Sequence, residues 1–331
     1  MHLKDKNLIA VAIDAAQGKL HSNYTQADAS ETIREAMEKL FGTRNIDYKT
    51  FRRHKVEIFE FIEETITPAV HTKLEETFNR FAEFRSIPYG DAKRFNVPSS
   101  ELFKVATIAE GSWNIRRQRL EGADFEIETQ SIASGFYEEL SRFLAGRVDW
   151  AMYVNTLIRS FERDIAIRIS NALYGAYDTL TAPYVASVSG GDAKEQVLEV
   201  ASRVEAENGS VVIIGTRSAL SQLEPEYFSD AQAGRRNELG YFGIVDGYDV
   251  MSLPQYHVPG TNEFGVKNDM LLILPQADEK LVKVILEGNA LMREVAGDSD
   301  AREDMQMQYD VIQRVGVGVL TARQFGMVKL G

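Results

Sequence analysis

The sequence predicts an α+β fold with an extended β-hairpin, a long helix, long antiparallel strands and a compact α/β module. Three observations support it: a two-stranded ribbon pattern, an apolar stripe that continues over 136–178, and an alternating pattern over 305–320. A helix of about 40 residues would be roughly 60 Å long, and a strand of about 16 residues would span roughly 50 Å. Elements of this length are longer than most single compact domains are wide. We therefore expect contacts with other copies of the chain to complete their burial.

The composition is that of an ordinary soluble globular protein: of 331 residues, 44% are hydrophobic and 26% are charged. The absence of cysteine excludes disulfides, thiolate nucleophiles and thiolate metal sites. A net charge of −12 without a basic stripe argues against a dedicated nucleic-acid binder. No stretch has the pattern of a signal peptide or a membrane helix, so we expect a cytoplasmic origin and no membrane partner.

Residues 1–90 predict an N-terminal helical arm. Asp28 begins a capping-box pattern, and Gly42 ends the helix that follows it. A second helix is expected over 47–66. Thr67 and the proline after it then predict the start of a third helix, with the threonine as its N-cap.

Residues 91–134 predict an extended loop in the form of a β-hairpin. Apolar and polar side chains alternate over 103–109 and again over 124–129, which gives a ribbon with one apolar and one charged face. Two strands alone are marginally stable in water. We therefore expect contacts with neighbouring copies to order this ribbon.

The tip of the ribbon carries the candidate subunit-interface residues, which are Trp113, Arg116, Arg117 and Arg119. Aromatic residues and arginines are enriched among the anchors of protein interfaces. Because the chain is rich in carboxylates, we expect the arginines to dock on an acidic surface of another copy. The alternatives are a solvated turn for the arginines and a tryptophan folded back on its own ribbon.

Residues 135–182 predict a long helix. Its apolar positions, among them Leu144, Val148 and Phe161, recur at steps of three, four and seven with one polar interruption. The leucine pattern of a free coiled coil is missing. We expect the apolar stripe to pack on the sheet that contains 305–320.

Beyond the long helix the elements become short and alternate in type, which predicts a compact α/β module over 183–277. Its expected elements are a helix over 192–207, a buried strand over 211–214, a short helix capped by Thr216, and strands over 248–253 and 270–274.

Residues 278–331 predict the closing strands. Apolar and polar side chains alternate from 305 to 319, and only Gln313 interrupts the apolar face. Gly316 and Gly318 lie within this strand. Glycine inside a strand indicates the close approach of another backbone or a bulge.

The sequence contains no catalytic, cofactor-binding or metal-binding constellation. Its five histidines lack metal-binding spacing, and it has neither a phosphate-binding glycine loop nor a nucleophile elbow. The acidic run over 298–304 lacks the glycine and glutamate of a calcium loop. We therefore predict a protein that is not an enzyme and that uses no cofactor.

The order of these elements resembles the major capsid protein of tailed bacteriophages with the Hong Kong 97-type fold. The ribbon over 97–132 is similar to that family's extended loop, the helix over 136–178 to its spine helix, and 183–275 to its axial domain. The stretch GYFGIVDGYDVMSLP over 240–254 resembles the family's recurring glycine, strand and s-x-P stretch. The run over 313–330, which ends in VGVGVLTARQFGMVKL, resembles the family's last strand and terminal segment.

This resemblance implies a major capsid protein that assembles as hexamers and pentamers into an icosahedral shell. The shell would enclose double-stranded phage DNA without sequence-specific binding. Implied partners are a separate scaffolding protein and a portal, and the implied location is the virion capsid after assembly in the host bacterial cytoplasm. Two other interpretations stay open: an encapsulin-type shell that encloses cargo proteins, and a soluble α/β enzyme with its site within 183–275.

Overall fold

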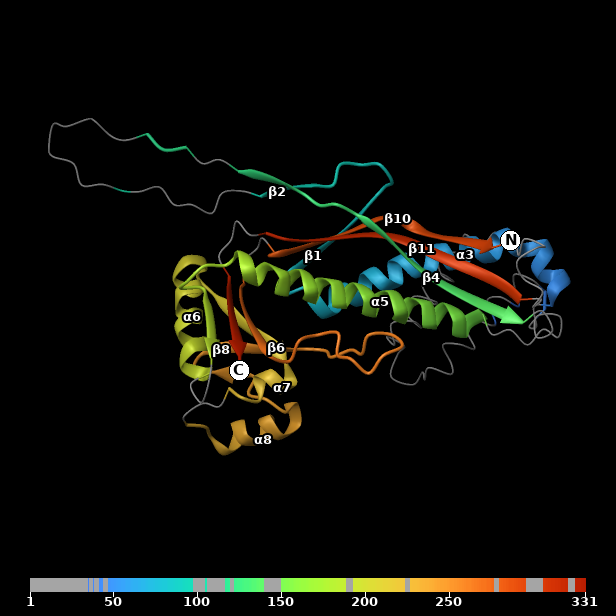
Figure 1. Ribbon diagram of the computed structural model, residues 1–331. Coiled ribbons are helices and arrows are strands. Elements are labelled where there is room, and N and C mark those ends of the chain that lie inside the picture. The colour runs from blue at the N-terminus through green and yellow to red at the C-terminus, as the bar shows by residue number, and fades with distance from the viewer. Residues whose placement is uncertain are drawn as a thin grey trace.

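Two β-sheets and two long helices make up the body of the computed structural model (Figure 1). In the described part of the chain, no helix is long and apolar enough to cross a membrane. The described residues are 47–97, 122–139, 150–188, 193–223, 227–276, 280–295, 306–320 and 325–331, together with Glu35, Glu38, Gly42, Thr43, Val105 and 117–119.

A four-stranded sheet forms the elongated half of the molecule. Its strands, in spatial order, are β1 (Ala82–Ile87), β10 (Val282–Val295), β11 (Gln306–Val319) and β4 (Gln130–Glu139). β1 runs parallel to β10, and the other two pairs are antiparallel. The long closing strand predicted from the sequence is confirmed as β11. Its equally long partner β10 is not among the predicted strands, because its alternation changes phase at a β-bulge.

Two helices, α3 (Tyr48–Phe78) and α5 (Trp150–Gly175), lie side by side on one face of this sheet (Figure 1). Their apolar stripes and the inward side chains of β10 and β11 form the main core. Ile158, Phe161 and Ile165 of α5 are each at most 4% exposed there. The predicted packing of the long helix on the sheet that contains β11 is confirmed.

The long helix begins later in the chain than the sequence predicts. Residues 136–139, which the apolar spacing assigns to the helix, form the end of β4, where Phe136 pairs in register with Tyr309 of β11. Burial alternates along β4, and over so few residues a period of two resembles the edge of a helical stripe. Leu144 and Val148 of the predicted stripe lie outside the described residues.

The prediction that a new helix starts at Thr67 is wrong, because α3 continues through Pro68. The buried hydroxyl of Thr67 has a different role from capping. It accepts a hydrogen bond from the Ala290 amide and donates one to Gln313 Oε1, both at 2.9 Å. Thr67 thus ties the middle of α3 to β10 and β11.

A six-stranded sheet with the order β5-β12-β9-β6-β8-β7 forms the compact module. Its strands are β5 (Val185–Val188), β6 (Val211–Thr216), β7 (Ile244–Val245), β8 (Tyr248–Leu253), β9 (Met270–Pro275) and β12 (Gly326–Leu330). Three helices accompany this sheet: α6 (Ala193–Asn208), α7 (Arg217–Leu220) and α8 (Asp230–Leu239).

The predicted elements of the module are confirmed in the structure as α6, β6, α7, β8 and β9. Thr216 caps α7 as expected, since its hydroxyl accepts a hydrogen bond from the Ala219 amide at 3.3 Å. α8 is an additional helix, and its start carries a capping box between Ser229 and Gln232. The division of the chain into five segments at residues 90, 134, 182 and 277 stays a prediction.

The base of the extended hairpin is a separate two-stranded sheet of β2 (Arg94–Val97) and β3 (Ala123–Glu126). The returning strand predicted over 124–129 is shorter than expected, because residues 127–129 leave the ladder and lead into β4. The outgoing strand predicted over 103–109 lies outside the described residues, except for Val105, which is not in a strand.

Candidate functional site at the hairpin base

The hairpin base lies on the face of the four-stranded sheet opposite to α3 and α5 (Figure 1). Phe95 of β2 and Ile127, just after β3, pack on Ile87 of β1 and Ile285 of β10, and all four side chains are buried. At this end the hairpin therefore has a small core within its own subunit. The expectation that only neighbouring copies order the ribbon does not hold for its base.

Two glycines of β11 let the hairpin cross the sheet at close range. A Cβ atom at Gly316 would lie 2.9 Å from the backbone oxygen of Glu128, and one at Gly318 would lie 2.7 Å from the ring of Phe125. Real Cβ atoms do not approach other atoms so closely, so a side chain at either position would displace the hairpin. The close approach predicted for this glycine pair is confirmed.

Glu287 of β10 joins both legs of the hairpin to the sheet. Its side chain is only 1% exposed. Glu287 Oε2 lies 2.8 Å from Lys93 Nζ and accepts a hydrogen bond from the Thr129 hydroxyl at 2.5 Å. Because Lys93 precedes β2 and Thr129 follows β3, a single carboxylate connects the two legs.

Two further groups complete this arrangement, which we call the hairpin clamp. The Gly90 amide donates a hydrogen bond to Glu287 Oε1 at 3.3 Å, and Arg314 Nε of β11 lies 3.3 Å from Oε2. The hydrogen bonds from Lys93 and Thr129, together with the Gly90 amide and the Arg314 charge, outweigh the effect of burial. They lower the pKa of Glu287 from its usual 4.5 to about 2.

The clamp lies beside the β-bulge of β10. The register with β11 shifts between Glu287 and Leu291. Gly288, inside the bulge, has φ +68°, and the Tyr89 ring covers it so closely that a Cβ atom would lie 2.0 Å from the ring. Gln313 Nε2 donates to the backbone oxygens of Glu287 and Gly288 at 3.4 and 3.3 Å. The one polar residue that interrupts the apolar face of β11 therefore stabilises the bulge.

Cations also hold the hairpin through the ring of Phe95. The guanidinium carbon of Arg85 lies 4.4 Å from the ring centroid, and Lys283 Nζ lies 5.3 Å from it. The fully buried Lys283 also forms an ion pair with Glu83. Such cation–π contacts stabilise the docked ring more strongly when the cation is desolvated.

The predicted interface residues are not part of this site. Trp113 and Arg116 lie outside the described residues, and the side chains of Arg117 and Arg119 are exposed. Their role stays a prediction. The clamp itself was not predicted, since its members are spread over four segments of the chain. The available signal was Glu287, an acidic residue at the end of the apolar run LVKVIL.

Comparisons with solved structures identify the fold as the Hong Kong 97-type capsid fold. The capsid of a native GTA particle is 11% identical to this chain, with a TM-score of 0.54 over 77% of this chain and 90% of that one. The capsid of an empty GTA particle is 12% identical, with a TM-score of 0.50 over 77% and 89%.

The sequence also matches a protein family over almost its whole length. Residues 7–329 match the family described as "SPbeta prophage-derived putative capsid protein YonB". A search of curated proteins finds no match. Capsid proteins are structural components of a virion and not enzymes, and they act as assemblies of many copies. Since the match includes the hairpin, both sheets and the closing strands, the chain belongs to the YonB family of prophage-derived capsid proteins.

Proposed function

We propose that this chain is a major capsid protein whose hexamers and pentamers form an icosahedral shell around double-stranded phage DNA. The hairpin clamp is the observation that supports this most directly. It fixes both legs of the hairpin to a long sheet, so the chain segment that connects β2 to β3 starts and ends at one defined place on the subunit. In a closed shell, a neighbouring copy is the natural binding partner of such an element.

The candidate interface residues on the hairpin fit the same role. Trp113, Arg116, Arg117 and Arg119 lie between the two clamped legs. A tryptophan and three arginines are suited to dock on an acidic surface. An acidic docking surface is favoured because the chain carries 49 acidic and 37 basic residues.

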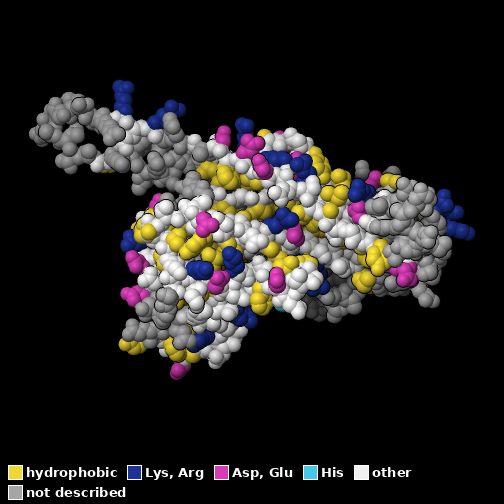
Figure 2. All heavy atoms as spheres, in the orientation of Figure 1, with side chains coloured by type: hydrophobic (Ala, Val, Ile, Leu, Met, Phe, Trp, Pro, Cys, Tyr) yellow, Lys and Arg dark blue, Asp and Glu magenta, His cyan; other side chains and the backbone are white. Residues whose placement is uncertain are grey.

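Exposed apolar side chains supply further contact surfaces. Tyr227 before α8 is 84% exposed, Tyr137 of β4 is 59% exposed, and Phe264 between β8 and β9 is 57% exposed. Figure 2 shows hydrophobic side chains in several separate patches on one face of the molecule. Contacts that build rings use different patches of the same chain, so patches on different elements fit repeated head-to-tail association.

The remaining partners follow from the proposed role. A separate scaffolding protein would guide assembly, and a portal would occupy one vertex of the shell. On the face in Figure 2, Lys and Arg side chains alternate with Asp and Glu. This mixed surface supports enclosure of DNA without sequence-specific binding. Assembly would take place in the bacterial cytoplasm.

Electron microscopy of the purified full-length chain tests the proposal. We expect closed shells of uniform size, and we expect particles made during phage production to contain DNA. Particles that contain a cargo protein and no DNA would favour an encapsulin-type compartment. A chain that remains monomeric at all concentrations and binds a small molecule saturably would contradict the proposal and favour a soluble enzyme.

A further inference from the structure

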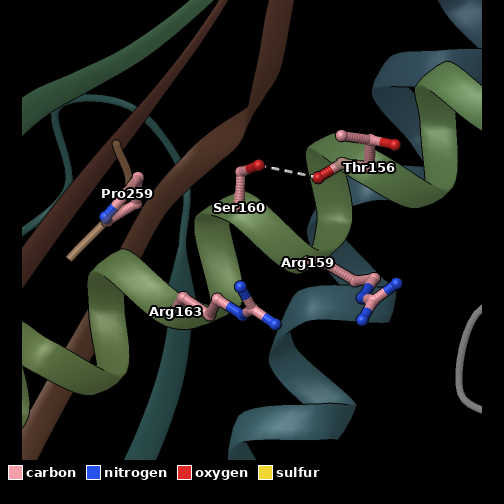
Figure 3. A pocket seen from close by; sticks show the side chains of 5 residues that line it. All are labelled: Thr156, Arg159, Ser160, Arg163 and Pro259. Carbon is pink, nitrogen blue, oxygen red and sulfur yellow. Dashed lines mark hydrogen bonds between the residues drawn. The ribbon is translucent and has the colours of Figure 1, made fainter. Parts of the chain in front are cut away.

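A small pocket on the outer side of α5 carries two arginines (Figure 3). Its volume is about 280 Å³, and the described residues that line it are Thr156, Arg159, Ser160 and Arg163 of α5 and Pro259 of the loop between β8 and β9. Both guanidinium groups lie along the same edge of the helix. They are one turn apart, which is the spacing at which two side chains act on one ligand.

Among the described residues, neither arginine has a carboxylate partner. Both side chains are exposed. The nearby acidic residues of α5 are engaged elsewhere: Glu162 lies 3.5 Å from Lys73, and Asp164 lies 2.6 Å from Arg168. In a chain with a net charge of −12, the described part of the structure thus has a local pair of positive charges here without a carboxylate partner.

Both hydroxyl groups of the pocket already donate hydrogen bonds to backbone oxygens, so the guanidinium groups are its available donors. The Thr156 hydroxyl donates to the backbone oxygen of Met152, and the Ser160 hydroxyl donates to that of Thr156, both at 2.8 Å. The planar guanidinium group donates paired hydrogen bonds to the oxygens of phosphate or carboxylate. The pocket is thus suited to an anion with several oxygens.

We propose that this pocket binds the phosphate backbone of the enclosed DNA, with a weak contact from each of the two arginines in every subunit. The inference rests on the proposed function, because it takes DNA as the enclosed polymer. Phosphate is favoured over a second copy of the chain, since the described lining contains no aromatic or large aliphatic side chain. Interfaces between proteins are centred on such side chains.

The pocket lies on the side of the subunit that the hairpin base does not occupy. α5 and the hairpin base lie on opposite faces of the four-stranded sheet. A subunit that forms part of a shell wall therefore presents the arginines on the side away from its hairpin. Repetition of the pair in every subunit lets many weak contacts act together on one polymer. Backbone contacts of this type carry no sequence information.

Surface plasmon resonance would test the proposal. Full-length subunits are immobilised at high density, and the probe is a DNA duplex of about 200 base pairs, which is long enough to contact several subunits. The test variant is Arg159→Gln with Arg163→Gln. The control is Arg203→Gln with Arg293→Gln, which removes the same charge from two exposed arginines that have carboxylate partners. We expect the test variant to bind about tenfold more weakly at low salt. The slope of log affinity against log salt concentration should fall in magnitude by about 1.8 for each subunit that the duplex contacts, as for two lost phosphate contacts per subunit.

The control should bind as the wild type does, and both variants should still form shells. Equal DNA binding by the wild type and the test variant would overturn the proposal, as would a wild type that fails to bind at low salt. Unchanged DNA binding with a loss of shells in the test variant alone would show that another copy occupies the pocket. Failure of the wild type to form shells would instead contradict the proposed function. Electron microscopy measures shell formation independently of DNA binding.

Discussion

At the scale of single residues, Glu287 determines how the hairpin attaches to the sheet. A buried carboxylate is costly unless charges and hydrogen bonds compensate for the loss of water. Here Lys93 and Arg314 supply the charges, and Thr129 and Gly90 supply the hydrogen bonds. The energy of the arrangement therefore depends on both hairpin legs being in place.

Glu287→Gln removes the charge that these cations surround. We expect a loss of about 3 kcal/mol in the free energy of unfolding. This value is at the lower end of the range for breaking a buried ion pair, because Lys93 and Arg314 keep partial access to water. Denaturant titration of the unassembled subunit measures this loss. The control Glu126→Gln breaks an exposed pair with Arg94 and should cost under about 1 kcal/mol. Equal losses in the two variants would show that Glu287 has no special role.

The same residue predicts a dependence of stability on pH. The pKa of Glu287 falls from 4.5 to about 2 on folding, so its contribution is fully present above its unfolded pKa. The contribution disappears as the pH falls from 4.5 towards 2. The stability difference between the wild type and Glu287→Gln should shrink over this range in denaturant titrations. A difference that stays constant down to pH 2 would contradict the assigned cause.

Gly316→Ala should destabilise the subunit by about 1–3 kcal/mol, because the added Cβ atom meets the backbone of Glu128. Gly234→Ala in α8 is the matched control, since no atom lies within 4 Å of the added Cβ. It should be neutral or stabilise the subunit by about 0.4–1 kcal/mol. Thermal unfolding compares the two variants. Similar shifts in Tm would mean that the hairpin moves away from the added Cβ atom without a loss of stability.

Residue types in the sequence predicted some of these roles and not others. Gly316 and Gly318 indicated a close approach, because glycine weakens a strand and is typical of places where another backbone needs the space. Thr216 was predictable as a cap because its partner lies three residues away. Glu287 could not be assigned to the clamp, since its partners are distant in the chain and only the fold brings them together.

At the scale of elements, the long helix and the long strands stabilise each other. α5 buries its stripe on β11 and beside α3. Its outer face carries the arginine pocket. One helix thus contributes to the core on one side and presents a charged surface on the other.

Phe161→Ala should cost about 3–5 kcal/mol in the free energy of unfolding, because the ring is 4% exposed in the main core. Arg159→Ala on the same helix should cost under about 1 kcal/mol, since its side chain is exposed. Thermal unfolding of the unassembled subunit measures both. Small and equal shifts would place the stripe of α5 outside the core.

The elements also show where sequence patterns fail. The end of β4 was assigned to the helix because Phe136 fits both periods, and only its partner strand β11 decides between them. The start predicted at Thr67 followed a common rule for threonine and proline. Tertiary hydrogen bonds to Ala290 and Gln313 replace that local role.

At the scale of the whole molecule, the segment between the two clamped hairpin legs is the part that we expect to contact other subunits. Replacing residues 99–121 with a short glycine-serine turn keeps β2, β3 and the clamp. We expect a folded, soluble subunit that no longer forms shells, because the base retains its own core. Circular dichroism and gel filtration check the fold, and electron microscopy checks assembly. Full-sized shells from this variant would contradict the proposed role of the hairpin.

The place of β12 in the six-stranded sheet has a consequence for the timing of biosynthesis. β12 follows β11 in the chain, yet it lies between β5 and β9 and is the only described strand that pairs with β5. A chain that ends before residue 326 therefore has a compact module that lacks the strand that joins β5 to the rest. We expect growing shells to exclude such incomplete subunits, because one defective copy would compromise a whole particle.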